Sequence, residues 1–398
     1  MPDLAAQRPT RAEINLDNLI HNFRVTRAAV GDAAIMAAVK ADAYGHGAVE
    51  CARALESAGA DWFGVALPEE GIALRKGGIA RPILCLGGFW EGQAESMIAY
   101  RLTPVVFRFD DLAALNREAH KTGHNVDYHL KVDTGMGRLG VQCSELAGFL
   151  DGAIQFENLR LDGLMTHLAS AANLDQDLFT KQQLDLFDRA IEAVQSRVVR
   201  SGGHSPRWIH AASSAGALAY PRARGNLVRP GGVLYGLWRD VISPSTEPLD
   251  WRPVLSLRTR IVLVKTVKAG APLGYGGTFV TARDSRIATI AIGYEDGLRR
   301  ELSNRGQVIV RGLLAPIVGR VSMDLTLIDV TGVEGASIND EVAIIGSQGE
   351  SRITAEEVAV LLGTISYEVT CGISDRVPRV YLTTEPEREP ASKAQPRR

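Results

Sequence analysis

Short apolar runs alternate with amphipathic segments through the first 235 residues of the chain. Apolar residues recur three and four positions apart, the spacing of a helix with one buried face, over 46–60, 68–78, 108–123 and 178–200. The intervening runs are short, continuous and bounded by turn residues, which is typical of strands buried on both faces of a parallel sheet. These predicted strands are residues 34–39, 62–67, 82–87, 102–107, 126–132, 159–166, 208–212 and 226–230.

The strand and helix alternation predicts an α/β fold, a (β/α)8 or TIM barrel. The alternative is a doubly wound open sheet, which has the same alternation. The barrel is favoured because the number of predicted strands is eight and because no GxGxxG turn follows the first strand. A short strand and a helix are predicted before the barrel, over residues 11–31.

The pattern changes after a stretch rich in proline and serine at residues 239–253. Beyond it, short β-branched runs are separated by glycine and aspartate turns, which predicts a mostly β C-terminal domain. We therefore expect a barrel domain over 12–240 and a β domain over 241–384, with residues 10–16 as a candidate strand of the β domain. The polar, proline-rich end at 385–398 predicts a disordered tail.

Composition limits the class of partner. The chain is 45% hydrophobic and 23% charged, and its net charge of −2 disfavours nucleic acid or an anionic membrane surface as the main partner. Residues 1–11 lack the apolar stretch of an export signal and no run is long enough to span a bilayer, so a cytoplasmic location is expected. The four cysteines form no CxxC pair, and neither a disulfide framework nor a metal site is expected.

Charged residues stand at the carboxyl ends of several predicted barrel strands, where barrel enzymes form their active sites. Lys40 ends strand one, His167 ends strand six and Arg229 lies at the end of strand eight. Strand five carries Lys131, followed by Asp133. Because parallel strands converge in a barrel, these side chains are predicted to face one mouth.

Small residues follow strands seven and eight. Ser213 and Ser214 come after strand seven, and Gly231 and Gly232 come after strand eight. Barrels commonly bind phosphate between these two loops, where hydroxyls and uncrowded backbone N–H groups approach the anion. Each pair alone also fits a helix cap or a turn, but together, at these positions, they favour a phosphate site.

A nucleophilic lysine beside a phosphate site indicates one kind of cofactor. Strand eight adjoins strand one in a closed barrel, so Arg229 would lie close to Lys40, and a desolvated amine beside another cation is a nucleophile for carbonyls. A cofactor with both an aldehyde and a phosphate, pyridoxal 5'-phosphate, is therefore predicted. The alternative for Lys40 is a strand-end lysine whose amine extends to solvent.

The segment AVKADAYGHG at 38–47 resembles the cofactor-lysine motif of alanine racemases. Further segments resemble this family, in its order, up to residue 381: HLKVDTGMGRLG, HAASSAGALAYP, VRPGGVLYGL, GYGGTF, IGYEDG, GRVSMD and SYEVTCGISDRVPRVY. The resemblance implies a cytoplasmic isomerase that interconverts L-alanine and D-alanine with pyridoxal phosphate and supplies D-alanine for peptidoglycan.

By this resemblance, Lys40 would bind the cofactor covalently and act as one of two bases. Arg229 would face the pyridine nitrogen and keep it unprotonated, which makes the ring a weaker electron sink and favours reprotonation at Cα. His167 would lie at the ring. Ser214, Gly232 and Tyr367 would bind the phosphate, and Ser213 is a weaker candidate. Tyr44 would lie near the phosphate end of the cofactor, and Gly231 would be a further cofactor-binding residue.

Racemisation needs a second base on the opposite face of Cα, and no predicted barrel strand ends in one. Tyr275, in the β domain, resembles the family's second base, which relatives receive from the partner subunit. The resemblance therefore implies a homodimer with shared active sites. On composition alone, Tyr275 is more simply an ordinary strand aromatic.

A substrate site is also implied by the resemblance. Arg138 would bind the alanine carboxylate or tune the phenol, aided by the backbone N–H of Met323 from the partner. Tyr294 and Asp324 would line a narrow entrance, which favours alanine over longer side chains. Lys131 resembles a lysine that relatives carry as a carbamate, which positions the arginine.

Departures from the family pattern occur at Asp42, Ser213, Gly232 and Glu295, the last of which adds a negative charge near the expected entrance. Three other functions stay open. A barrel-fold decarboxylase would have a glutamate in an EPG context where this chain has Arg229 in RPG. A broad-specificity or serine racemase is closer, although such enzymes often carry an export signal. A non-catalytic carrier of pyridoxal phosphate would leave the second domain unexplained.

Overall fold

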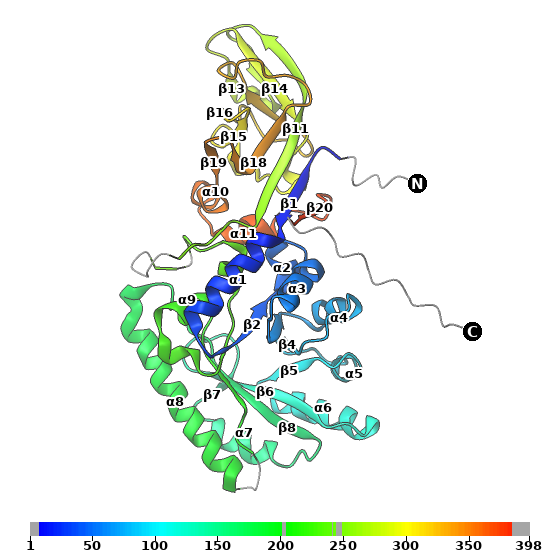
Figure 1. The fold of residues 1–398 in the computed structure, drawn as a ribbon, viewed down its shortest axis with the longest axis vertical. Coiled ribbons are helices and arrows are strands. Elements are labelled where there is room, and N and C mark those ends of the chain that lie inside the picture. Colours follow the sequence, from blue (N-terminus) through cyan, green and yellow to red (C-terminus); the bar gives the residue numbers. More distant parts are fainter. Residues whose placement is uncertain (1–7, 201–203, 241, 244–248, 384–398) are drawn as a thin grey trace, which may run out of the picture.

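The structure is a computed structural model that describes residues 8–200, 204–240, 242–243 and 249–383. The tail expected at 385–398 and part of the stretch at 239–253 lie outside the described residues. Two bodies follow one another along the long axis in Figure 1: a barrel in blue to green and a β domain in yellow to orange. Their junction contains the short helix α11 (Ser366–Cys371), next to α2 (Lys40–Gly45).

The predicted barrel is confirmed. Its strands are β2 (Ala34–Ala38), β3 (Trp62–Val65), β4 (Ile83–Cys85), β5 (Thr103–Val106), β6 (Val126–Asp133), β8 (Leu159–Met165), β9 (Trp208–His210) and β10 (Leu227–Val228), with the short β7 (Val141–Gln142) beside β6. They pair in parallel in the order β10-β2-β3-β4-β5-β6-β8-β9. The ring closes where Ser213 and Arg229 form a parallel bridge and the Arg229 N–H donates to the Ala212 carbonyl at 3.0 Å.

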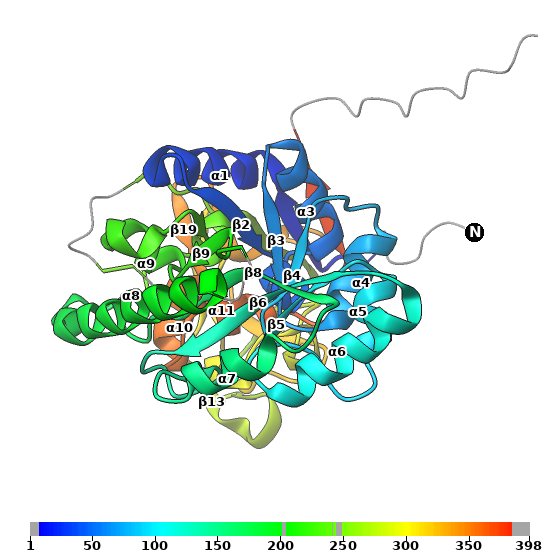
Figure 2. The same ribbon diagram turned by 90° about the horizontal axis from the view of Figure 1, so that it is seen from below.

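Helices surround this ring, as the view in Figure 2 shows. The four segments with helical spacing form α3 (Ala48–Ser57), α4 (Pro68–Lys76), α6 (Phe109–Thr122) and α8 (Asp177–Arg200). The remaining barrel helices are α1 (Leu16–Val30), α5 (Ala94–Ala99), α7 (Leu146–Ala153) and α9 (Ser214–Ala219). No helix in the described part of the chain is long and apolar enough to cross a membrane.

The barrel interior is closed by apolar side chains below the predicted site. A buried cluster is formed by Met36, Trp62, Leu84, Val105, Met165 and Leu227, which come from six different strands. Side chains from six strands of one ring can meet only inside it, so this cluster is a packed layer rather than a channel. Lys40, His167 and Arg229 follow these residues a few positions later along their strands, and therefore stand at the mouth above the layer.

The second domain is mostly β, as predicted. Its larger sheet has the order β16-β15-β18-β11-β1-β20, with β14, β17 and β19 attached. The strands are β1 (Arg11–Asn15), β11 (Leu255–Val267), β14 (Ser285–Ile290), β15 (Gln307–Val310), β16 (Leu313–Pro316), β17 (Thr326–Asp329), β18 (Glu341–Gln348), β19 (Ser351–Ile353) and β20 (Arg379–Leu382). A separate hairpin joins β12 (Pro272–Leu273) to β13 (Phe279–Val280), and α10 (Ala355–Leu362) precedes α11.

The first strand of the chain belongs to the second domain. Strand β1 pairs antiparallel with β11, where Ala12 lies opposite Leu257, and parallel with β20, where Ile14 lies opposite Tyr381. Because α1 leaves β1 directly and packs on the barrel, the two domains are joined twice along the chain.

Candidate active site

Eleven residues predicted from the sequence line one cavity at the carboxyl end of the barrel. Its volume is about 440 Å³. The barrel strands and the loops after them contribute all but one of these side chains, and α11 contributes Tyr367. The eleven are Lys40, Tyr44, Lys131, Arg138, His167, Ser213, Ser214, Arg229, Gly231, Gly232 and Tyr367.

The chain turns with left-handed backbone immediately after Lys40. Residues 41–44 all have φ between 51° and 56°, although none of them is glycine. Left-handed helical backbone costs about 1–2 kcal/mol per residue for an L-amino acid, so this turn must be held by its surroundings. Glu70 accepts the N–H of Ala41 at 2.6 Å, and Asp42 accepts the N–H of Ala48 at 2.7 Å. The turn thereby brings both Lys40 and Tyr44 to the cavity wall.

Lys40 contributes an amine to the wall of the cavity. Burial lowers its pKa below the ordinary lysine value, and the positive charges of Arg138 and Arg229 lower it further. A lowered pKa makes the neutral, nucleophilic amine more available near neutral pH. The lysine therefore has the environment expected for attack on a carbonyl group.

Another part of the cavity wall is formed by neutral polar groups. Ser214 Oγ accepts the N–H of Gly231 at 2.9 Å. An added Cβ would overlap the Tyr44 hydroxyl at Gly231 and the Tyr367 hydroxyl at Gly232, so both phenols reach the backbone only because these positions are glycine. Hydroxyls and backbone N–H groups gathered in this way fit a phosphate group, and Lys40 on the same cavity fits an aldehyde.

Arg229 is buried at the mouth, where its guanidinium has four polar partners. It is 5% exposed and donates to the carbonyls of Thr166 and Ala211, each at 2.9 Å. It also donates to Nδ1 of His210 at 2.8 Å and contacts Nδ1 of His167 at 3.2 Å. Burial lowers its pKa to about 10, so the guanidinium stays charged at neutral pH.

The histidines around Arg229 are neutral. Burial, followed by the charges of Arg229, Lys131, Arg138 and Lys40, lowers the pKa of His167 to about 3. Because a guanidinium can only donate, Nδ1 of His210 must accept, and its Nε2–H then donates to Nδ1 of His129 at 2.9 Å. His129 and His210 were not among the predicted site residues, although each interrupts an apolar strand and could have been suspected for that reason.

Lys131 and Arg138 occupy the side of the cavity formed after β6. Burial, then the charges of Arg229 and Arg138, lowers the pKa of Lys131 to about 8. Burial alone would raise the pKa of Asp133, but N–H donors from Gly135 and Gly137 outweigh it and lower that pKa. These bonds order the loop that leads to Arg138.

Four predicted site residues lie outside this cavity. Tyr275, Tyr294, Met323 and Asp324 belong to the β domain, and all four are exposed. Tyr275 is 72% exposed, in the loop between β12 and β13. The segments that carry Tyr294 and Met323 are joined by two backbone bonds, from Tyr294 N–H to the Ser322 carbonyl at 3.0 Å and from Glu295 N–H to the Met323 carbonyl at 3.1 Å.

A barrel with a half-buried lysine and a group of hydroxyls and backbone N–H groups at its mouth, followed by a β domain, defines a two-domain barrel enzyme. Residues 14–238 match the family model "Alanine racemase, N-terminal domain" and residues 254–381 match "Alanine racemase, C-terminal domain". The chain belongs to the alanine racemase family. Its activity is therefore the interconversion of L-alanine and D-alanine, an isomerase reaction, as the sequence predicted, and the family depends on pyridoxal phosphate.

Individual relatives match along nearly their whole length. The chain is 43% identical to the alanine racemase of Halothermothrix orenii over 377 residues, which cover 94% of this chain and 97% of the relative. The crystal structure of the Streptomyces lavendulae alanine racemase is 35% identical with a TM-score of 0.87, over 94% of this chain and 97% of that one. The structure of the Bartonella henselae alanine racemase with covalently bound pyridoxal phosphate is 29% identical with a TM-score of 0.82, over 94% and 99% of the two chains.

Proposed function

We propose that this racemase holds pyridoxal 5'-phosphate on Lys40 and uses two bases, Lys40 and Tyr275 of the partner subunit, in a homodimer with shared sites. One observation carries the proposal. Lys40 lines the cavity at the barrel mouth, whereas Tyr275 lies outside it, 72% exposed on the other domain. A second chain could bring that phenol to the cavity without any change of fold.

The residues of the cavity fit the cofactor. Lys40 would attach it, Ser214, Gly231, Gly232, Tyr44 and Tyr367 would bind its phosphate, and Ser213 would be a further contact. Bound pyridoxal phosphate supplies a conjugated ring that acidifies the Cα proton of an attached amino acid. Arg229, charged and held by four partners, would keep the ring nitrogen unprotonated, and His167 would stand beside it.

Apart from Lys131, which is assigned below to a carbamate, the described residues that line the cavity offer no good second base to oppose Lys40. Burial raises the pKa of Tyr44 and of Tyr367 well above the ordinary value, so neither phenol ionises readily. The low pKa of His167 makes it too weak a base to take a Cα proton. This supports a base from outside the cavity, and Tyr275 is the candidate.

Substrate binding is proposed for residues of both subunits. Arg138 lines the cavity without a partner among the described residues, which leaves its guanidinium free for the alanine carboxylate. The backbone N–H of Met323 of the partner subunit would assist, and the partner's Tyr294 and the partner's Asp324 would narrow the entrance. A narrow entrance over a cavity of about 440 Å³ that also holds the cofactor favours a small side chain.

Lys131 is proposed to carry a carbamate that positions Arg138. Only the neutral amine reacts with carbon dioxide, and a pKa of about 8 leaves a substantial neutral fraction near neutral pH. As pH rises through 8 that fraction grows, so carbamate content is expected to increase from pH 7 to pH 9. Carbon-13 NMR with labelled bicarbonate measures it, and Lys131→Met should remove the signal whereas Lys76→Met, at an exposed helix position, should not. An unchanged signal in Lys131→Met would place the carbamate elsewhere.

Hybrid dimers test the shared site. Differently tagged Lys40→Ala and Tyr275→Phe chains are expected to be inactive separately. Purified by both tags, the hybrid should have one working site, built from the intact Lys40 of one chain and the intact Tyr275 of the other, and so about half the wild-type activity. If the hybrid is as inactive as its parents, each chain carries its own complete site and the proposal fails.

We further propose that the enzyme acts in the cytoplasm and supplies D-alanine for peptidoglycan, as expected from the sequence. Growth of a D-alanine-requiring bacterium that expresses this chain checks this role. Continued dependence on added D-alanine, despite active protein in the extract, would count against it.

A further inference from the structure

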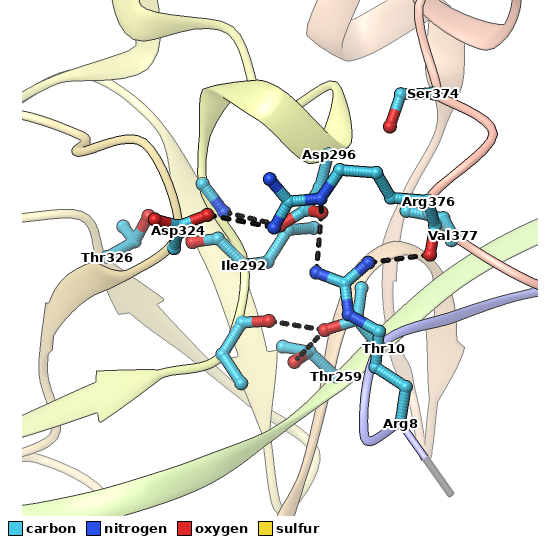
Figure 3. A network of polar contacts seen from close by, with 12 residues as sticks. Arg8, Thr10, Thr259, Ile292, Asp296, Asp324, Thr326, Ser374, Arg376 and Val377 are labelled. Atoms are coloured by element: carbon cyan, nitrogen blue, oxygen red, sulfur yellow. Dashed lines mark hydrogen bonds and ion pairs between the residues drawn. The ribbon is translucent and has the colours of Figure 1, made fainter. Parts of the chain in front are cut away.

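One arginine links the two surface segments that would reach the partner's site. Arg376 Nη2 donates to Asp324 Oδ1 at 2.8 Å, and Arg376 Nε lies 3.3 Å from Asp296 Oδ1. Asp324 follows Met323, and Asp296 ends the short turn Tyr294–Asp296. Figure 3 shows the guanidinium of Arg376 between the two carboxylates. Neither Arg376 nor Asp296 is among the site residues predicted from the sequence.

Asp296 is the buried member of this group of charged residues. Its side chain is fully buried, and its Oδ2 accepts the N–H of Gly293 at 3.0 Å. Arg8 pairs with Asp296 at 2.5 Å and donates to the carbonyl of Arg376 at 2.7 Å, so it holds both members of the pair (Figure 3). We call Arg8, Asp296, Asp324 and Arg376 the arginine clamp.

The arginine clamp lies beside a close contact between the backbones of the two segments that carry Tyr294 and Met323. An added Cβ at Gly293 would overlap the carbonyl of Met323, so the two segments touch without room for a side chain between them. With the two backbone bonds already described, this contact sets how far the segments lie apart. The guanidinium of Arg376 spans the two segments from the side with its planar fork, which a lysine amine cannot reproduce.

We propose that Arg376 is a positioning residue that fixes Tyr294 and Met323 for the active site of the partner subunit. This inference rests on the proposed function, because only in a shared site do these segments meet substrate. Misplacing a binding group by about 1 Å can cost about 10²-fold in rate. Loss of Arg376 is therefore expected to act on the partner's site and not on the site of its own chain.

The contribution of Arg376 to folding is expected to be small. Its side chain is 39% exposed and that of Asp324 is 58% exposed, and ion pairs this accessible contribute little to stability. Without Arg376, buried Asp296 still has Arg8 and the Gly293 N–H as partners. Arg376→Ala should therefore fold, and Arg376→Lys provides a milder variant with the charge retained.

Two hybrids with the same set of substitutions distinguish the partner's site from the chain's own. In the first, a Lys40→Ala/Arg376→Ala chain is paired with a wild-type chain, so the one working site receives Tyr294 and Met323 from the altered chain. In the second, a Lys40→Ala chain is paired with an Arg376→Ala chain, so the working site receives these segments from a chain with intact Arg376. A Lys40→Ala chain paired with wild type is the reference.

The first hybrid is expected to lose about 10- to 100-fold in kcat/KM, mainly through KM, and the second to equal the reference. Arg376→Lys in the same two arrangements should give a smaller loss with the same asymmetry. Equal losses in both hybrids, a loss only in the second, or no loss would overturn the inference. The hybrid of Lys40→Ala with Tyr275→Phe is measured alongside. If this hybrid is active, an overturning result refutes only the role of Arg376. If it is inactive, the shared site is refuted as well.

Discussion

Lys40→Ala is expected to abolish racemisation, with kcat lower by about 10⁴-fold or more. A positioned general base contributes about 10²–10⁴-fold by itself, and this amine would also attach the cofactor. Its lowered pKa, caused by burial and by Arg138 and Arg229, is the physical basis of both tasks. Initial rates in both directions, with pyridoxal phosphate added, measure the effect.

The absorption spectrum separates attachment from catalysis in the same variant. Wild-type protein with cofactor should absorb near the edge of the visible range, and Lys40→Ala should lack that band. Lys76→Ala, which removes an exposed lysine at the end of α4, is the matched control and should keep both the band and the rate. A covalent adduct that survives in Lys40→Ala would refute the assignment of this lysine.

Tyr275→Phe is expected to slow proton removal from one enantiomer of alanine about 100-fold or more relative to the other. The substitution removes only the hydroxyl, so binding and fold should change little while one of two bases is lost. Exchange of the Cα proton with deuterium from solvent, followed separately for L-alanine and D-alanine, measures the two faces independently.

Tyr100→Phe provides the matched control for Tyr275→Phe. Tyr100 lies at the end of α5 on the barrel and does not line the cavity. Its substitution should leave both exchange rates unchanged. Equal losses for the two enantiomers in Tyr275→Phe would contradict a division of labour between two bases.

Much of the fold could be predicted because barrel strands and helices leave different periods in the sequence. All eight apolar runs proposed as strands form the ring, and the convergence of strand ends placed Lys40, His167 and Arg229 at one mouth. The pairing of β1 with β20 is different, because β20 is four residues long and carries no alternation that identifies its neighbour. Such long-range pairing depends on tertiary packing.

The parts of the site that could not be predicted depend on contacts far apart in sequence. Residues 41–44 contain no glycine, so their sequence does not indicate left-handed backbone. From the sequence, Glu70 is only an acidic residue in the first turn of a predicted helix, and its bond to Ala41 could not be expected. The contact of Arg229 with His210 joins two strands, and the arginine clamp joins residues 8, 296, 324 and 376. No local sequence pattern predicts these long-range contacts.

The exposure of Tyr275 has a consequence for the enzyme at low abundance. If the phenol serves only in a neighbouring copy, turnover per chain follows the mass action of self-association and falls on dilution even though every chain stays folded. A molecule that merely caps the surface around Tyr275 would then silence the enzyme without entering the barrel at all.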